Sequence, residues 1–247
     1  MGVITKVDEQ RWRKAQEWER RYWESKDHIR NRFGLNKLWP LIALTGYKPA
    51  YRGDDWNAWW RDHFEGYGFL PPRCENAIEL GCGPYTNMRM LLAGTYVDYI
   101  YLLDPLMPVY RTFANTFASK AARQYNLIFD PHPIETCPYG DPFFDVVVMI
   151  NVLDHVMDAE LCMQKAVSMT KAGGILIVGQ DLSNEEDIRR LSTQSHDVGH
   201  PIKVDHAWME ERLLGSTEVI LHHILDRSEG REPDHHYGTL IYAGRKR

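Results

Sequence analysis

The stretch Glu79-Leu80-Gly81-Cys82-Gly83-Pro84 follows a short apolar run and precedes a helical pattern. A glycine-rich turn between a strand and a helix lets backbone approach a bound nucleotide without interference from Cβ atoms. Asp104 stands at the end of the next apolar run, Tyr99–Leu103. At that position a carboxylate reaches the two hydroxyls of a ribose. The turn and the acid together predict a cofactor that carries a nucleoside, bound near residue 81.

The composition excludes several other classes of protein. The chain has 247 residues, of which 44% are hydrophobic and 26% charged, as in an ordinary globular protein. A net charge of −5 gives no electrostatic case for binding nucleic acid. No apolar run reaches the roughly 18 residues that would predict a membrane span, and the charged N-terminus is unlike a secretory signal. These features predict a cytoplasmic protein.

The cysteines argue against a structural metal or a disulfide framework. They show no CxxC spacing, which a zinc site or a redox motif would require. The four residues are Cys74, Cys82, Cys137 and Cys162.

The first 70 residues differ from the rest of the chain. The segment Asp8–Arg32 is charged and aromatic, contains no proline, and predicts a long helix. All tryptophans except Trp208 lie in this N-terminal third, and Pro71-Pro72 ends it. We therefore divide the chain into a helical cap, 1–70, and a main domain, 71–247. The aromatic residues either pack the cap onto the main domain or line a lid over a substrate pocket.

The main domain alternates between strand and helix patterns, which predicts a parallel sheet with helices on both faces. Its last two strands lack a crossover helix and predict an antiparallel hairpin. The fold class is therefore α/β and Rossmann-like. The expected helices are Asn87–Ala93, Met107–Gln124 and Ala159–Thr170, and the expected strands are Ala77–Leu80, Tyr99–Leu103, Leu127–Phe129, Val146–Ile150, Ile175–Gly179, Thr217–Leu225 and Tyr237–Ala243.

With these motifs in place, residues 74–247 resemble the class I S-adenosylmethionine-dependent methyltransferases of small-molecule type. The resemblance implies a seven-stranded sheet, an enzyme, and S-adenosylmethionine as the cofactor. It places Glu79, Gly81, Cys82 and Gly83 near the methionine part of that cofactor. Asp104 would hold the ribose hydroxyls, with Pro105 beside the adenine.

Two further segments extend the resemblance. In His132-Pro133-Ile134-Glu135, Ile134 would flank the adenine, and Glu135 or backbone would replace the aspartate that many members use for the adenine amino group. In Asn151-Val152-Leu153-Asp154-His155-Val156, Asn151 would lie beside the methionine moiety. In the N-terminal helix, Trp18 or Tyr22 would close over the cofactor.

The first motif departs from related patterns at two positions. Tyr85 stands where the third glycine of the family motif falls, so its side chain would project near the cofactor or the substrate. Thr86 stands where a dinucleotide-binding motif needs glycine, which weighs against a nicotinamide dehydrogenase.

Candidate catalytic residues follow the fourth and fifth predicted strands. His155 has a pKa range that suits a general base, although packing or orienting is its alternative role. Asp181, His196 and His200 lie in or beside an expected irregular polar loop, where they would bind the acceptor or act as base. Gly199 and Pro201 disfavour a helix there, so the spacing of His196 and His200 does not imply metal ligation. No metal is expected, although a divalent ion held by Asp181, His196 or His200 is a lesser alternative.

The sequence thus predicts a methyltransferase for a small polar acceptor, such as a sugar or another metabolite, methylated on oxygen with a histidine base. Nitrogen methylation is the close alternative. A catalytically silent subunit that binds cofactor and a partner is the rival from another class, and a dehydrogenase is a distant third. The expected partner is a small-molecule acceptor, without nucleic acid or membrane, and a homodimer is compatible with the sequence.

Overall fold

The structure is a computed structural model that describes residues 3–27, 57–113, 116–121, 124–192 and 194–247. Side chains are not described for 26–27, 120–121 and 195–196. The tryptophans at 39 and 56, expected in the cap, lie outside the described residues. Within the described residues no helix is both long and apolar enough to cross a bilayer.

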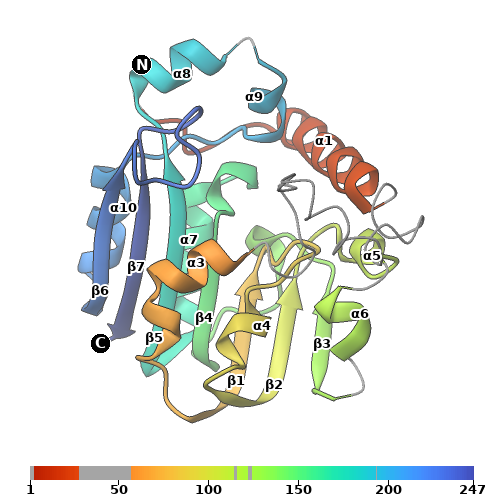
Figure 1. Cartoon of the computed structure of the whole chain (residues 1–247), viewed down its shortest axis with the longest axis vertical. Helices are drawn as coiled ribbons and strands as arrows, with labels where there is room; N and C mark the ends of the chain where they lie inside the picture. The colour runs from red at the N-terminus through yellow and green to blue at the C-terminus, as the bar shows by residue number, and fades with distance from the viewer. Residues whose placement is uncertain (1–2, 28–56, 114–115, 122–123, 193) are drawn as a thin grey trace, which may run out of the picture.

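A seven-stranded sheet forms the centre of the molecule, in the order β3-β2-β1-β4-β5-β7-β6 (Figure 1). Neighbouring strands among the first five pair in parallel, whereas β7 is antiparallel to both β5 and β6. The predicted fold class and its closing hairpin are therefore confirmed. The strands are β1 (Arg73–Leu80), β2 (Tyr96–Leu103), β3 (Leu127–Asp130), β4 (Phe144–Ile150), β5 (Thr170–Leu182), β6 (Thr217–Asp226) and β7 (Gly238–Lys246).

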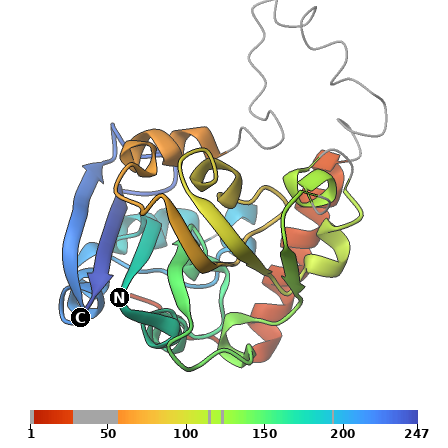
Figure 2. The ribbon, with the colours of Figure 1, turned by 90° about the horizontal axis from the view of Figure 1, so that it is seen from below.

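Helices cover both faces of the sheet (Figure 2). One apolar core lies under α7 (Ala159–Met169) and α10 (His206–Leu214). The other lies under α3 (Ala58–His63), the short helix η4 (Glu65–Tyr67) and α4 (Met88–Leu91). Strand β4 is buried along almost its whole length because it contributes side chains to both cores.

The helical segments differ from the expectations in two places. The single helix expected over Met107–Gln124 is wrong, because α5 (Met107–Tyr110) and α6 (Phe117–Ala121) are separate. The hydroxyl of Thr116 accepts a hydrogen bond from the Ser119 amide, which starts α6 anew.

The loop after β5 is also more regular than expected. It contains α8 (Glu185–Leu191), whose N-terminus is closed by a capping box, and α9 (Ser195–Gly199). Gly199 and Pro201 therefore end a short helix rather than prevent it. A further helix, α10, was not predicted and follows the cap residue Asp205.

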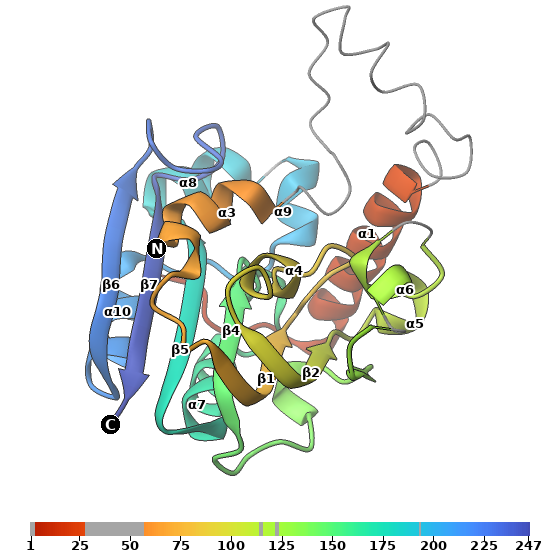
Figure 3. The same ribbon diagram turned by 60° about the horizontal axis from the view of Figure 1, so that its bottom comes forward.

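The N-terminal helix α1 (Glu9–Asp27) packs against α9 and closes over the carboxyl ends of the strands (Figure 3). Arg11 donates hydrogen bonds to the carbonyls of Val198, at 2.6 Å, and Asp197, at 2.5 Å. Gly199 faces the ring of Trp18, and a Cβ atom at this position would collide with it. The predicted helix thus binds to a segment almost 190 residues later in the chain.

Candidate active site

A cavity of about 940 Å³ lies at the carboxyl ends of β1, β2 and β4, beneath α1. Open parallel sheets bind ligands at this edge, where strand ends and their loops converge. All eleven residues expected to bind cofactor line it: Tyr22, Glu79, Gly81, Cys82, Gly83, Tyr85, Asp104, Pro105, Ile134, Glu135 and Asn151.

The glycine turn wraps one end of this cavity. Gly81 and Gly83 have φ angles of +64° and +56°, which side-chain-bearing residues rarely adopt. The Gly81 amide donates to the Leu103 carbonyl at 2.8 Å, which ties the turn to the end of β2. A Cβ atom on Gly81 would lie 2.5 Å from Cγ1 of Val152, whereas one on Gly83 would meet open space. Gly81 is thus required by packing, and Gly83 by backbone conformation alone.

Asp104 joins the turn to the loop after β2. Its carboxylate accepts hydrogen bonds from the amides of Gly83, at 3.0 Å, and Leu106, at 2.8 Å. Burial raises the pKa of Asp104 to about 7, and these amide hydrogen bonds only partly oppose the shift. A buried carboxylate on the cavity wall is the group that the ribose assignment requires.

Two other predicted acids are already engaged by the protein. Glu79 accepts hydrogen bonds from the hydroxyl of Thr86 and from both the amide and the side chain of Asn87. Glu135 accepts from the amides of Met157, at 2.7 Å, and Asp158, at 3.1 Å. Both carboxylates therefore brace loops that form the cavity wall.

Asp181 does not line the cavity. Its carboxylate accepts hydrogen bonds from Arg231, at 2.6 and 3.0 Å, and from Thr239 at 2.9 Å. With its amide group in the orientation that fits these neighbours, Asn151 donates to Asp181 and accepts from Arg231, each at 2.9 Å. This network fixes Arg231, which does line the cavity, and makes Asp181 a supporting group for its wall.

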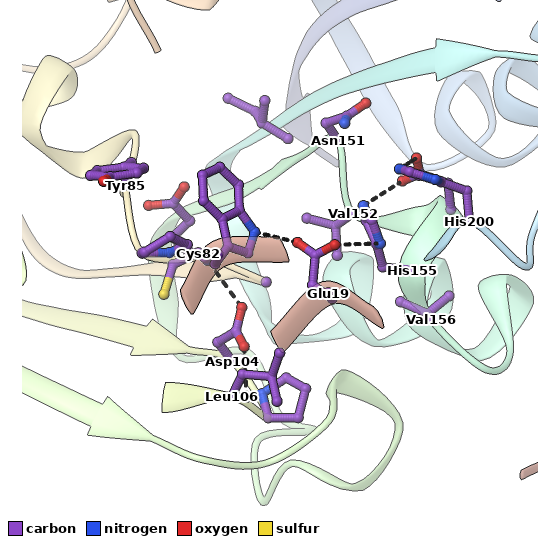
Figure 4. A pocket seen from close by; sticks show the side chains of 18 of the residues that line it. Glu19, Cys82, Tyr85, Asp104, Leu106, Asn151, Val152, His155, Val156 and His200 are labelled. Atoms are coloured by element: carbon purple, nitrogen blue, oxygen red, sulfur yellow. Dashed lines mark hydrogen bonds and ion pairs between the residues drawn. The ribbon is translucent and has the colours of Figure 1, made fainter. Parts of the chain in front are cut away.

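His155 and His200 face the opposite end of the cavity from the glycine turn (Figure 4). The ring centroids of the two histidines lie 4.5 Å apart. Nδ1 of His155 is 3.0 Å from the Gly199 carbonyl oxygen, so it carries the proton and Nε2 has the lone pair. Nε2 of each ring lies 3.8 Å from the carboxylate of Asp154. The structure does not describe the side chain of His196.

Charges around His155 decide its protonation. Burial alone would lower the pKa of His155, but the carboxylates of Asp154 and Glu19 outweigh it and raise the pKa above its ordinary value. Burial would raise the pKa of Asp154, but His155 and His200 hold it below its usual range. The histidine and the acid thus stabilise each other's charged forms.

Aromatic side chains roof the cavity. Tyr22 stacks on Trp18, with ring centroids 5.3 Å apart, and Tyr85 packs edge-on against Trp23 at 5.5 Å. Trp60 belongs to the buried core and also lines the cavity, as Trp12, Trp18 and Trp59 do. Both expected roles of the cap aromatics, packing and cavity lining, are therefore present.

Sequence reasoning missed three residues of the site. Glu19 extends from α1 into the cavity, where Oε2 lies 3.6 Å from Nδ1 of His155. Asp154 was noted only as part of a motif, and Arg231 was not singled out at all. Spacing could have indicated Glu19, which lies one turn from Trp23 on the same helix and accepts its indole hydrogen bond. The positions of the other two depend on the folded loops.

Comparisons with known proteins agree with this geometry. Residues 78–178 match the profile of a methyltransferase domain family. A similar solved structure is the YcgJ protein of Bacillus subtilis, 14% identical, covering 75% of this chain and 99% of that chain with a TM-score of 0.55. A comparison with curated protein sequences gave no match.

Two other similar structures show how widely the fold is used. One is geranyl diphosphate C-methyltransferase of Streptomyces coelicolor A3(2), in complex with Mg²⁺, geranyl-S-thiolodiphosphate and S-adenosyl-L-homocysteine. It is 11% identical, with coverage of 77% of this chain and 76% of that chain and a TM-score of 0.58. The [4+2]-cyclase SpnF is 14% identical, with coverage of 85% and 93% and a TM-score of 0.56. At such identities these likenesses show the fold alone.

The residues at the glycine turn fit the methyl donor that this domain family uses. The turn exposes backbone at the two glycines, where other residues would carry a Cβ atom. Beside it lies the buried carboxylate of Asp104, which accepts a hydrogen bond from the Gly83 amide. Pro105, Leu106 and Ile134 add an apolar surface suited to a planar base. The donor's activated methyl group supplies the chemistry, and the protein's part is to hold and align it.

Proposed function

Residues 78–178 form a methyltransferase domain of the class I S-adenosylmethionine-dependent family, and on this premise we propose that the protein methylates an oxygen atom of a small polar molecule. S-adenosylmethionine is its methyl donor. We further propose that His155 accepts the proton of the acceptor hydroxyl. The observation that carries this proposal is the orientation of His155 at the cavity end opposite the glycine turn, with Nδ1 held by the Gly199 carbonyl.

Transfer to a hydroxyl requires three coupled events. The acceptor oxygen bonds to the methyl carbon, the carbon–sulfur bond breaks with its electron pair left on sulfur, and the hydroxyl proton passes to Nε2 of His155. The resulting imidazolium is stabilised by Asp154 and Glu19, which already favour the charged ring. A positioned base of this kind contributes about 10²–10⁴-fold to the rate.

The remaining wall fits a small polar acceptor. Trp59, Arg231, Glu232 and His235 line the same cavity and combine an indole surface with polar groups. Such mixed surfaces bind sugar-like molecules through stacking and hydrogen bonds. No stripe of lysine and arginine lines the described cavity, so its chemistry does not favour a nucleic-acid acceptor.

One observation favours an amine acceptor as the second candidate. The described cavity lining has six carboxyl groups against one guanidinium, Arg231. Burial raises the pKa of Glu79 and Asp104, but the other four carboxyl groups still favour cations. An amine needs only to arrive neutral, so its transfer requires no base in the step itself. The six acids are Glu19, Glu79, Asp104, Glu135, Asp154 and Glu232.

Isotope transfer tests the proposal directly. The protein is incubated with methyl-labelled S-adenosylmethionine and fractionated polar metabolites, and the labelled product is identified by mass spectrometry. We expect label on a hydroxyl oxygen, and about 10²-fold or greater loss of turnover in His155→Gln. His223→Ala, which removes an exposed histidine on β6, is the matched control and should retain full activity.

Three results would contradict parts of the proposal. Label on nitrogen would replace the oxygen acceptor with the amine. Full turnover in His155→Gln would remove the base. Tight binding of S-adenosylhomocysteine without transfer to any fraction would favour the catalytically silent subunit.

A pH profile tests the base itself. Methyl-transfer activity should rise with pH through a midpoint above 6.5, because the pKa of His155 is raised.

A further inference from the structure

Three metal-ligating side chains converge on the wall of the cavity that holds His155. Nε2 of His155 lies 3.8 Å from Oδ1 of Asp154, and Nε2 of His200 lies 3.8 Å from Oδ2. One ligand atom from each of the three residues lies within 4.8 Å of the other two. All three line the same cavity as the glycine turn. They come from two loops 45 residues apart, so spacing in the sequence gave no sign of them.

The carboxylate of Asp154 is buried, with the residue only 4% exposed. Neither Oδ atom has a hydrogen bond of ordinary geometry among the described residues, although the side chain of Gln180 favours the charged carboxylate. The two imidazoles at 3.8 Å stand beyond hydrogen-bond range. A buried carboxylate needs a compensating charge, because an unpaired one costs several kcal/mol. Without a metal the neighbouring imidazoles supply that charge when they are protonated, and a cation between the three side chains would replace those protons.

The surroundings orient His155 as metal ligands are usually oriented. A ligating histidine donates its second ring N–H to a carbonyl or carboxylate, which fixes the lone pair on the other nitrogen. Nδ1 of His155 has this partner in the carbonyl of Gly199, 3.0 Å away. Gly199 directly precedes His200, so one short segment at the end of α9 orients one ligand and supplies another.

The distances fit a first-row divalent ion once the side chains move inward. Bonds of about 2.0–2.2 Å in a tetrahedral site separate neighbouring ligand atoms by roughly 3.3–3.6 Å. The two separations of 3.8 Å go to different oxygens of Asp154, and the set with one atom per residue lies within 4.8 Å. The side chains must therefore move inward, by up to roughly 1.5 Å, to close on the ion. Two imidazoles and one carboxylate suit Zn²⁺ and its neighbours rather than Mg²⁺ or Ca²⁺, which prefer oxygen.

We propose that Asp154, His155 and His200 form a three-ligand site for a divalent first-row transition cation, with its open position facing the cavity. The excess of carboxyl groups on the described lining favours such a cation. Zinc sites with three protein ligands leave their fourth position for water or substrate.

The consequence for chemistry rests on the proposed function. At the open position the cation takes the acceptor oxygen as a ligand and lowers the pKa of its hydroxyl. The proton is then lost to water in the cavity, and Nε2 of His155 acts as a ligand instead of a base. The loaded and metal-free proteins thus remove the same proton by different routes.

Calorimetric titration of the chelator-treated, full-length protein with Zn²⁺ tests the site. Co²⁺ provides a second readout, since its visible absorption reports nitrogen and oxygen ligands in low-symmetry sites. We expect one cation per chain, and at least about 100-fold weaker binding in Asp154→Asn and His200→Gln. His223→Ala, on the surface of β6, should bind as the unaltered protein does.

Several outcomes overturn the proposal. These are absence of Zn²⁺ binding at millimolar concentration, equal affinity in the two ligand variants, or loss of binding in His223→Ala alone. Affinity for S-adenosylhomocysteine and thermal unfolding establish that each variant is folded. If Asp154→Asn fails to fold, His200→Gln carries the test.

Methyl transfer then separates this proposal from the proposed function. Oxygen methylation that persists at full rate after chelation refutes the metal route and leaves the His155 base in place. Cation binding together with label only on nitrogen refutes the oxygen acceptor and leaves the metal site in place.

Discussion

The two ends of the cavity are built in different ways. The donor end consists of a turn and an acid that directly follow neighbouring parallel strands, with Gly81 bonded to Leu103 and Gly83 to Asp104. The acceptor end is assembled from α1, the segment after β4, α9 and the β6–β7 connection. Short-range motifs determine the first, and tertiary contacts between distant segments determine the second. Substitutions should therefore have different consequences at each end.

The largest expected effect on stability lies at the acceptor end. Arg231→Met leaves the fully buried carboxylate of Asp181 without its charged partner. We expect the free energy of unfolding to fall by about 3–5 kcal/mol, as for other buried ion pairs broken on one side. Chemical denaturation measures this change. The double variant Arg231→Met/Asp181→Asn should recover part of the loss, and no recovery would show that the pair itself is not the cause.

At the donor end, Gly81→Ala should be the most damaging small substitution. Its Cβ would meet Val152 at 2.5 Å, and its φ of +64° disfavours a side chain. Together these effects cost about 2–4 kcal/mol. Gly83→Ala is the matched control, because Gly83 also has a positive φ but a Cβ atom there would meet no neighbour. This substitution should cost only about 1–2 kcal/mol. If the two variants lost the same free energy of unfolding and the same affinity for S-adenosylhomocysteine, the packing argument would be contradicted.

Asp104→Ala should weaken binding of S-adenosylhomocysteine by on the order of 1–3 kcal/mol through loss of hydrogen bonds to a charged acceptor. Because the pKa of Asp104 is raised to about 7, affinity of the unaltered protein should also fall as pH drops through 7. Calorimetry at several pH values measures both effects. Unchanged affinity in the variant would refute the ribose assignment, and Asp104→Asn should lose the pH dependence.

The same shift has a defined sign for the cofactor-free protein. The unfolded carboxyl ionises near 3.8 and the folded one near 7. The contribution of Asp104 to the free energy of unfolding therefore falls as pH rises from about 4 to about 7, and it stays constant above that range.

The smallest effect concerns closure of α1 over the cavity. Arg11→Met removes hydrogen bonds to the carbonyls of Asp197 and Val198. We expect a loss of about 1 kcal/mol in stability, with faster dissociation of S-adenosylhomocysteine in stopped-flow measurements. The neighbouring Arg13→Met, which breaks only an exposed pair with Glu9, is the control and should change neither. Equal rates in both variants would refute a role for α1 in closure.

This contrast explains what could be predicted from the sequence. The parallel strands and the donor turn follow from apolar runs and glycine placement, which act over a few residues. The convergence of Asp154 with His200 could not be predicted, because it depends on where α9 ends against α1. The pairing of Asp181 could not be predicted for the same reason: its partner Arg231 lies 50 residues later and reaches it only through the hairpin.

A crystal structure with S-adenosylhomocysteine tests the division of the cavity most directly. We expect the ribose hydroxyls on the carboxylate of Asp104, the adenine beside Ile134, and the sulfur turned toward His155 and His200. A ribose bound away from Asp104, or a sulfur facing away from the two histidines, would contradict it.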